Sequence, residues 1–371
     1  MIVPLPGARE LFSLDPEIVQ LNHGSFGAVP IEVQQAQRRW RDELERAPDR
    51  FFARLPGRLA EARGRIAAFL GTGGGALVAN ATEGVAVALG SIPVRPGDEI
   101  IHTDHGYAAV ELALRRHAAE TGAVLVRAEL GADPVAAITG AVTERTRIAV
   151  FDHVSSSAAR LLPVARLVKE LAAREVVTVV DGAHAPGMLP LDLDALGADF
   201  WVGNLHKWAF APRPAAMLAV APHWRERVRP LVVSYGEGYP AAVEWRGTGD
   251  YSSWLAAPEG LAVLERLGIE RVRAHNQALA AYGQRVLAEA LAGEAVPGWP
   301  GVPMRVVRLG PGLGTTRAEA DALGELVLDR LGYQIKIEPG GLLRLSAQIY
   351  NTTADYDRLA ERLPALLTGR R

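Results

Sequence analysis

The sequence predicts an α/β fold in which a large, doubly wound and mostly parallel sheet is followed by a smaller α+β domain. Three observations support this prediction. The chain has 371 residues, of which 49% are hydrophobic, so it can fill a large core and exceeds one typical domain. Between residues 76 and 220, short apolar runs alternate with helical patterns, as expected for βαβ units. After residue 258 the pattern changes to long helices with a few short strands.

The predicted elements follow from this pattern in chain order. Residues 1–45 form an N-terminal segment that we expect to pack with the small domain. Pro30 begins a helix that runs to about Arg46, and an amphipathic helix at 57–70 stops at the glycine-rich stretch 71–75. A large domain is predicted for residues 46–252, with strands at 76–79, 97–102, 123–127, 148–154, 176–180 and 215–220 and helices at 81–89, 131–142, 163–174 and one ending near 121. A small domain is predicted for residues 253–371, with helices at 257–267, 270–292, 317–331 and 354–368 and strands at 304–309, 334–337 and 341–346.

Charge and composition exclude several classes of protein. The net charge is −2 and no basic run is present, which argues against nucleic acid as a partner. No apolar run reaches the roughly 18 residues of a membrane-spanning helix, and the N-terminal residues lack the pattern of a secretory signal. We therefore expect a cytoplasmic protein that does not bind membranes. The chain has no cysteine, which excludes a disulfide, a thiolate metal site and a thiol nucleophile.

The lysines are scarce enough to be examined one by one. Of the 40 basic residues only Lys169, Lys207 and Lys336 are lysines, and the others are arginines. Lys169 falls off the apolar stripe of a helical pattern, and Lys336 alternates with two isoleucines, so both are expected on wet surfaces. Lys207 alone follows a strand-like run and is flanked by His206 and a tryptophan. It is therefore the candidate for a reactive amine.

An acid lies at the end of the preceding strand. The apolar run 176–180 ends abruptly in Asp181, followed by a glycine, an alanine and His184. A buried strand that ends this way delivers its acid to the carboxyl edge of a sheet, where open α/β folds bind ligands. An acid and a lysine at neighbouring strand ends suit pyridoxal phosphate, whose aldehyde requires an amine and whose pyridine nitrogen requires an acid.

A strand that runs directly into a helix predicts a phosphate site. The strand at 76–79 is followed by Asn80, Ala81, Thr82, Glu83 and Gly84, which open an apolar helix. Free N–H groups at a helix start and the helix dipole both attract an anion. An ordinary helix cap explains the same residues, so the prediction depends on the neighbouring acid and lysine.

Further polar residues have two readings each. His102 and His105 point to opposite faces of an extended run and no third ligand is near, which argues against metal binding. His105, or Tyr107 in its place, is predicted to lie on the cofactor ring, the alternative being histidines that only cap a strand. Arg344 shares a strand face with Ser346, which suits a clamp for a substrate carboxylate, although a surface ion pair is the alternative. The glycine-punctuated loop 22–30 is either a structural turn or a loop folded over the substrate.

Six motifs together resemble those of class V aminotransferases, and in particular the isopenicillin N epimerase-like branch. They occur in the family's order and span nearly the whole chain, at residues 21–30, 80–84, 181–184, 203–208, 245–250 and 344–352. The resemblance implies a fold-type I, pyridoxal phosphate-dependent transferase that forms a homodimer with active sites at the subunit interface. The family's cysteine desulfurases use a cysteine to accept sulfur, so that activity in its usual form is excluded here.

The resemblance also implies a role for each cofactor residue. Lys207 would be joined covalently to the cofactor, Asp181 would pair with the pyridine nitrogen, and His105 would stack on the ring. His184 would lie near the phenolic oxygen of the cofactor. The residues implied for the phosphate are Ala81, Thr82, Asn204 and His206, together with Thr248 of the partner subunit.

For the substrate, the resemblance implies that Arg344, with His153, binds the α-carboxylate, and that Asn22 and His23 line the mouth of the site. Lys207 is expected to remove the Cα proton of an amino acid or small peptide. A proton returned from the opposite face by Tyr107 or His105 would give epimerisation, the leading prediction. Loss of a β-substituent would give C–S cleavage, and proton return to the cofactor carbon would give transamination. A ligand-binding protein without catalysis is a further alternative, against which the intact pair of Lys207 and Asp181 speaks.

Overall fold

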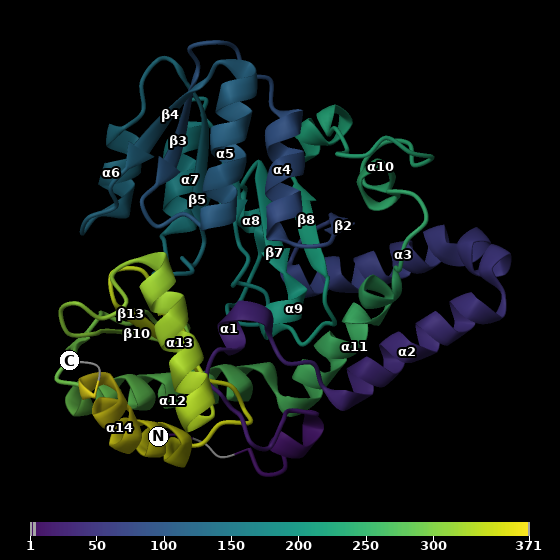
Figure 1. The fold of residues 1–371 in the computed structure, drawn as a ribbon. Coiled ribbons are helices and arrows are strands. Elements are labelled where there is room, and N and C mark those ends of the chain that lie inside the picture. The colour runs from purple at the N-terminus through teal and green to yellow at the C-terminus, as the bar shows by residue number, and fades with distance from the viewer. Residues whose placement is uncertain (1, 3–4, 370–371) are drawn as a thin grey trace.

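A computed structural model describes residue 2 and residues 5–369 of the chain. Its centre is a seven-stranded sheet with the order β2-β8-β7-β6-β5-β3-β4 (Figure 1). The strands are β2 (Ala76–Val78), β3 (Glu99–Thr103), β4 (Val124–Ala128), β5 (Thr146–Asp152), β6 (Val177–Asp181), β7 (Phe200–Asn204) and β8 (Ala216–Val220). β8 is antiparallel to both of its neighbours, and the other neighbouring pairs are parallel. The predicted large, mostly parallel sheet is confirmed.

Helices cover both faces of this sheet. The helices between its strands are α4 (Ala81–Ser91), α5 (Ala108–Thr121), α6 (Pro134–Gly140), α7 (Val164–Ala172) and α8 (Leu193–Leu196). Alternate residues of one strand enter two separate cores. In β5, Ile148 and Val150 pack with residues of α4 and α5, whereas Ala149 and Phe151 pack with residues of α6 and α7. Because a strand turns successive side chains to opposite faces, each buried strand needs apolar residues throughout.

A second sheet follows in the chain. It has four antiparallel strands in the order β12-β13-β10-β9, with bounds β9 (Glu294–Ala295), β10 (Met304–Arg308), β12 (Lys336–Glu338) and β13 (Leu342–Ser346). Its helices are α11 (Ser252–Leu267), α12 (Ile269–Ala290), α13 (Arg317–Leu331) and α14 (Thr353–Thr368). The strand expected at 334–337 is divided, because β11 (Tyr333–Gln334) pairs instead with β1 (Val19–Gln20) near the N-terminus. The division into domains at residue 252 stays a prediction.

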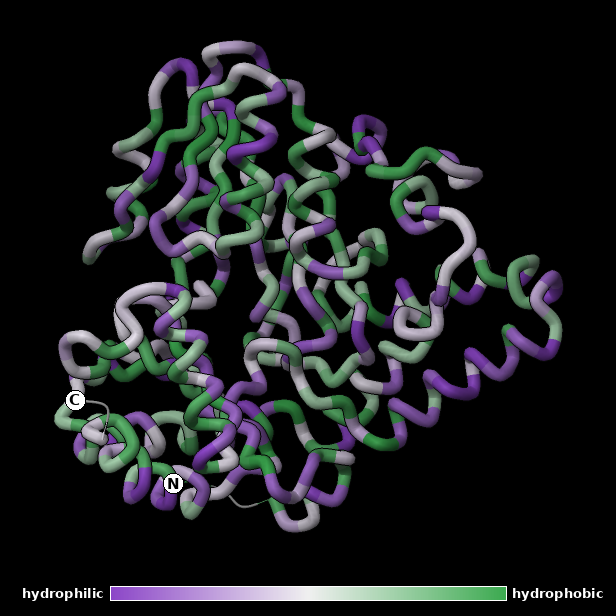
Figure 2. The backbone as a smooth tube through the Cα atoms, viewed as in Figure 1, coloured by the Kyte–Doolittle hydropathy of each residue, from purple (hydrophilic) through white to green (hydrophobic). Residues whose placement is uncertain are grey.

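The N-terminal helices are α1 (His23–Phe26), α2 (Ile31–Arg46) and α3 (Pro48–Leu70), and α2 and α3 project together to one side (Figure 1). Much of α2 carries the hydrophilic colour in Figure 2. The helix expected at 57–70 begins earlier than predicted, although Pro56 lies inside it. Phe51, Leu55 and Leu59 fall on one buried face, so the packing of this face outweighs the hydrogen bond that a proline removes.

Two other boundaries differ from the prediction. The helix expected at 131–142 is shorter, since Asp133 accepts hydrogen bonds from two N–H groups and begins α6 at Pro134. The helix expected at 257–267 starts at Ser252 and continues through Pro258. None of the described helices is long and apolar enough to cross a membrane.

Candidate active site

Lys207 and Asp181 follow two neighbouring parallel strands. Asp181 is the last residue of β6, and β7 passes directly into the short helix α9 (Leu205–Trp208), which carries Lys207. Because the carboxyl ends of parallel strands meet at one edge of a sheet, the acid and the amine share this edge. Burial raises the pKa of Asp181, while the N–H of Ala183 and the charge of Lys207 partly oppose that rise.

The surroundings of Lys207 favour a neutral amine. Its Nζ lies 3.2 Å from Nε2 of His184. The indole Nε1 of Trp208, which can only donate, lies 3.5 Å from Nδ1 of His184, so the histidine carries its proton on Nε2. Burial, followed by the charge of Lys207, holds the pKa of His184 well below its usual range, so the neutral ring can donate to an unprotonated amine. Burial, followed by the charge of Arg344, lowers the pKa of Lys207 from 10.5 to about 8.

The loop 22–30 supports the backbone of Lys207. Nε2 of His23 lies 2.8 Å from the carbonyl oxygen of Lys207, and Nδ1 lies 2.9 Å from the hydroxyl of Tyr350. Gly27 has a φ of +72°, and a Cβ at this position would come within 2.2 Å of the carbonyl oxygen of His206, so only glycine allows this approach. His23 is 1% exposed, and its hydrogen bond supports the backbone of Lys207. Asn22 lines the large cavity and His23 does not, so the role of His23 at the substrate mouth stays a prediction.

Three of the expected phosphate residues, Ala81, Thr82 and Asn204, meet at the start of α4. Asn204 ends β7, and its Oδ1 accepts the N–H of Ala81 at 2.8 Å, which joins the two elements. The N–H of Ala81 therefore already has an acceptor within the protein and is not free for a phosphate. The half-buried Thr82 is the next residue of this turn. His206 directs Nδ1 to the backbone of Ala215, 2.8 Å from its oxygen, which leaves Nε2 for a ligand. Burial lowers the pKa of His206 to about 4, so the ring is neutral.

Arg344 is buried at the back of a cavity. Its Nη1 donates to the carbonyl oxygen and the hydroxyl of Ser156 at 2.7 and 2.9 Å. Its Nη2 donates to Oδ1 of Asn22 at 3.1 Å and to the hydroxyl of Ser25 at 2.7 Å. Its Nε is buried and has no hydrogen-bond partner among the described residues. These four residues and Lys207 line one cavity of about 750 Å³. A carboxylate bound to Arg344 would therefore share this cavity with the Lys207 amine.

Two aromatic residues after β3 lie beside this site. Tyr107 lines the same cavity, is 47% exposed, and is close enough for its phenol to act electrostatically on Arg344. His105 places Nε2 3.9 Å from Oδ2 of Asp104. Its Nδ1 is buried without a partner in the part of the chain that the structure describes. Burial lowers the pKa of His105, so a neutral ring is available to lie against a cofactor.

Two predicted residues lie apart from the cavity. Nδ1 of His153 accepts a hydrogen bond from the indole Nε1 of Trp201 at 3.3 Å. The pleat of β5 turns His153 to the face that holds Trp201, and Ser156 takes the position beside Arg344 that the sequence assigned to His153. Thr248 is exposed in the loop before α11.

Three residues of the site were missed by sequence reasoning. Ser25 and Ser156 hold Arg344, and nothing in their local sequence distinguishes them from other loop serines. Asp152 lies beside Asp181 at the end of β5. The sequence contained a signal for Asp152, because this acid follows a buried apolar run as Asp181 does.

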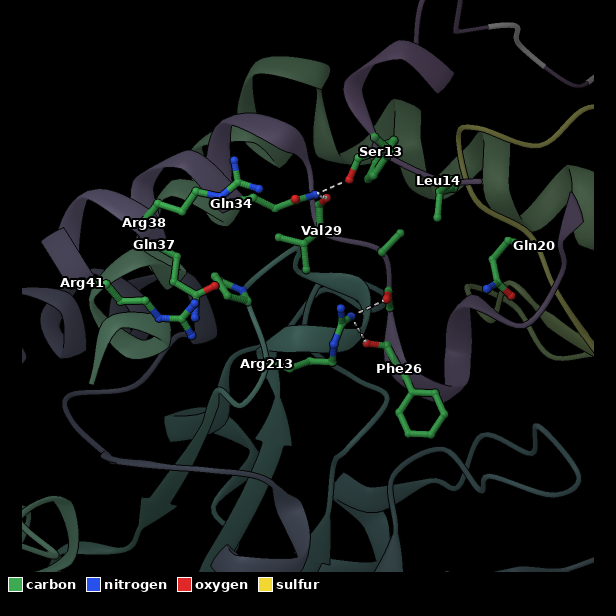
Figure 3. Close-up of a pocket in the computed structure, with 14 residues that line it drawn as sticks. Ser13, Leu14, Gln20, Phe26, Val29, Gln34, Gln37, Arg38, Arg41 and Arg213 are labelled. Atoms are coloured by element: carbon green, nitrogen blue, oxygen red, sulfur yellow. Dashed lines mark hydrogen bonds between the residues drawn. The ribbon is translucent and has the colours of Figure 1, made fainter. Parts of the chain in front are cut away.

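A second cavity of about 660 Å³ adjoins the loop 22–30 (Figure 3). Phe26 lines both cavities. Arg213 donates to the carbonyl oxygens of Phe26 and Gly27 at 2.9 and 2.6 Å, which fixes the loop that supports Lys207.

The donor set fits pyridoxal phosphate. The site offers an amine of lowered pKa, a buried acid one strand away, and a helix start with hydroxyl and imidazole donors for a phosphate. Nδ1 of His105 and Nε of Arg344 are buried polar atoms without a partner among residues 2 and 5–369, and a ligand can satisfy them. A seven-stranded sheet with a lysine and an acid in these positions defines a fold-type I pyridoxal phosphate enzyme.

Comparison with known proteins identifies the family. Residues 30–296 match the family described as Aminotransferase class-V. The chain is 34% identical to the isopenicillin N epimerase of Streptomyces clavuligerus, an alignment that covers 97% of both chains. It is 31% identical to the putative L-cysteine desulfhydrase 1 of Oryza sativa subsp. japonica, covering 94% of this chain and 83% of that protein. The chain belongs to the class V aminotransferase family, and it is an enzyme whose cofactor is pyridoxal 5'-phosphate.

Solved structures show the same fold. A cysteine desulfurase of Escherichia coli aligns with a TM-score of 0.82 at 21% identity, covering 97% of both chains. The cystine C–S lyase C-DES aligns with a TM-score of 0.83 at 19% identity, covering 94% of this chain and 98% of that chain. At these identities the likeness concerns the fold.

Proposed function

We propose that this protein acts at the Cα of an amino acid or small peptide and inverts its configuration, as an isopenicillin N epimerase-like enzyme. The observation that carries the proposal is the single cavity lined by Lys207, Arg344 and Tyr107. Epimerisation requires a group that takes the Cα proton and a second group that returns one from the opposite face. The amine and the phenol are candidates for these two groups.

When bound, pyridoxal phosphate supplies an aldehyde that captures the substrate amine and a ring that accepts the electron pair left at Cα. Asp181 would hold the proton on the pyridine nitrogen. Because Asp181 is buried, water would not compete for this contact. Arg344 binds the α-carboxylate through its buried Nε and one Nη2 proton, which the carboxylate takes over from Asn22 or Ser25, and this contact orients Cα toward Lys207. Lys207 Nζ takes the Cα proton, and the Tyr107 hydroxyl returns one from the other face.

The size of the cavity is compatible with a cofactor and an amino acid or small peptide bound together. Sites that enclose drug-sized ligands have volumes of roughly 300–1,000 Å³, and the cavity here measures about 750 Å³. The similarity to isopenicillin N epimerases at 34 and 35% identity over nearly the full length supports the same substrate class.

A second candidate function is a C–S β-lyase. It is supported by the similarity to L-cysteine desulfhydrases of Oryza sativa and Arabidopsis thaliana, at 28–31% identity. A β-lyase needs the amine that removes the Cα proton but no acid on the opposite face, so Tyr107 would be dispensable. Transamination is a third candidate, and it differs in that the proton returns to the cofactor.

One experiment separates these reactions. The loaded enzyme is incubated in D₂O with L-cysteine and, separately, with small peptides that carry a free L-α-amino acid group. Epimerisation gives inverted product with deuterium at Cα, β-elimination from cysteine gives pyruvate and sulfide, and transamination gives a keto acid with pyridoxamine phosphate. Tyr107→Phe provides the matched test. The proposal predicts that this variant still exchanges the Cα proton with retention but loses inversion, and undiminished inversion would contradict the role of Tyr107.

We further propose a homodimer in which Thr248 of one subunit reaches the phosphate of the other. Support comes from the exposure of Thr248, which lies in the loop before α11 and is free to contact a second subunit. Mixed dimers of Lys207→Ala and Thr248→Ala chains test the arrangement. If Thr248 acts across the interface, half of the sites in each mixed dimer are intact and a one-to-one mixture recovers about a quarter of wild-type activity. If Thr248 acts within its own chain, mixing recovers none.

A further inference from the structure

Asp152 is the direct neighbour of Asp181 in the large sheet. β5 and β6 are parallel, and their register pairs Asp152 with Asp181, two residues beyond the pair Val150 and Val179. Neighbouring strands are about 4.8 Å apart, and both acids point to the face that packs against α5. Each of the two is 4% exposed. Two carboxyl groups therefore lie side by side in the interior, and one of them is the acid assigned to the pyridine nitrogen.

The two acids have unequal partners. Asp181 accepts the N–H of Ala183 at 2.9 Å through Oδ1. Apart from its own N–H, the Asp152 carboxyl has no hydrogen-bond donor among the described residues. The charge of Lys207 acts on both acids from α9. Asp181 is therefore the better site for a negative charge.

Among the described residues, the others that line the space around Asp152 supply no cation. The two acids line a cavity of about 10 Å³, roughly the space of one water molecule. His102 and Tyr107 face it from the end of β3 and the following loop, and Glu111 faces it from α5. Burial lowers the pKa of His102, so this histidine is neutral. Burial, followed by the charge of Asp181, raises the pKa of Asp152 well above its usual range.

We propose that Asp152 and Asp181 form an acid–carboxylate pair with one negative charge, in which Asp152 keeps its proton and Asp181 keeps the charge that holds the pyridine nitrogen. Two adjacent buried carboxylates cannot both ionise without a large cost. Asp152 is thus a positioning residue that acts through Asp181. The inference rests on the cofactor role proposed for Asp181 and is independent of which reaction the enzyme catalyses.

The proton is measurable in the cofactor-free protein. A folded acid that keeps its proton above pH 4 must release it on unfolding, so the folded state binds more protons than the unfolded state. Stability then falls as the pH rises from the unfolded pKa of 3.8 toward the raised folded value. One extra proton corresponds to a tenfold rise of the unfolding constant per pH unit. Asp152→Asn keeps the shape and the neutral charge but cannot titrate, so it lacks this contribution.

The test is urea unfolding of cofactor-free wild type, Asp152→Asn and Val150→Ala at pH values from 5 to 7. We expect the unfolding constant of the wild type to rise about tenfold more per pH unit than that of Asp152→Asn. Val150→Ala removes packing on the same strand face without removing an acid, so it should keep the pH dependence of the wild type. Equal pH dependence in wild type and Asp152→Asn would overturn the proposal.

Titration with pyridoxal phosphate at pH 7 gives a second readout. Since Asn is neutral like the protonated acid, Asp152→Asn should bind the cofactor within about 3-fold of the wild type, whereas Asp181→Asn should bind at least 10-fold more weakly. An Asp152→Asn variant that loses cofactor as strongly as Asp181→Asn would also overturn the assignment, because Asp152 would then carry the charge. Neither readout depends on turnover, so a failure of the proposed reaction is distinguishable from a failure of this inference.

Discussion

The lowered pKa of Lys207 can be measured directly, because the chain contains only three lysines. Burial and the charge of Arg344 lower this pKa from 10.5 to about 8. At pH 7 such a lowering increases the neutral fraction of the amine about 300-fold, to about 9%. Only the neutral amine can add to an aldehyde, so this increase sets how fast the cofactor-free protein captures its cofactor.

The assay is competitive acetylation of the cofactor-free protein between pH 6 and 10, followed by digestion and mass spectrometry of the lysine-containing peptides. Lys207 lines the large cavity and is therefore within reach of a small reagent. The exposed Lys169 on α7 is the internal reference. We expect the acetylation of Lys207 to rise with a midpoint near pH 8. The variant Arg344→Gln, which removes one of the two causes, should move the midpoint upward. A wild-type midpoint above about pH 10 would refute the reasoning, since it is the ordinary value for lysine.

Three further predictions concern single residues. Lys207→Ala should lower kcat by about 10³-fold or more. Borohydride reduction followed by peptide mapping should find the pyridoxyl label on Lys207 of the wild type and on no peptide of the variant. A label on another lysine would contradict the assignment. Asn204→Ala should lower the free energy of unfolding by about 1–3 kcal/mol, because the buried N–H of Ala81 loses its acceptor. Asn204→Asp keeps an acceptor oxygen and should retain more of the stability in denaturant titrations. Its negative charge should make it bind the cofactor phosphate less tightly. Arg344→Lys should raise KM at least 10-fold with a smaller change in kcat, because a lysine cannot form the bidentate pair with the carboxylate; steady-state kinetics with an unchanged KM would argue against the clamp.

Local sequence patterns predicted the elements that deliver the site. The strands before Asp181 and Lys207 are short apolar runs that end in a polar residue, and such a run specifies both the strand and the edge at which it ends. The alternation of strands and helices predicted the parallel sheet. At the start of α3, one of the boundaries that differ from the prediction, the pattern contained a proline whose cost is outweighed by burial of a long apolar face.

Local sequence patterns could not predict which side chains from distant segments contact each other. Arg344 receives Asn22, Ser25 and Ser156 from two other parts of the chain, and these contacts exist only once the two sheets have packed. Nothing local in the sequence predicted that His23 supports the backbone of Lys207, a contact that the packed loop makes.

By itself, the sequence determined which residues have the chemistry: Lys207 and Asp181 at the ends of neighbouring strands, no cysteine, and a helix start suited to phosphate. The tertiary structure decided how these groups are tuned. Strand register set Asp152 beside Asp181, and packing removed water from the Lys207 amine and placed His184 against it. The physical reason is that charge states depend on burial and on neighbours across strands, which are properties of the folded chain that no local stretch contains.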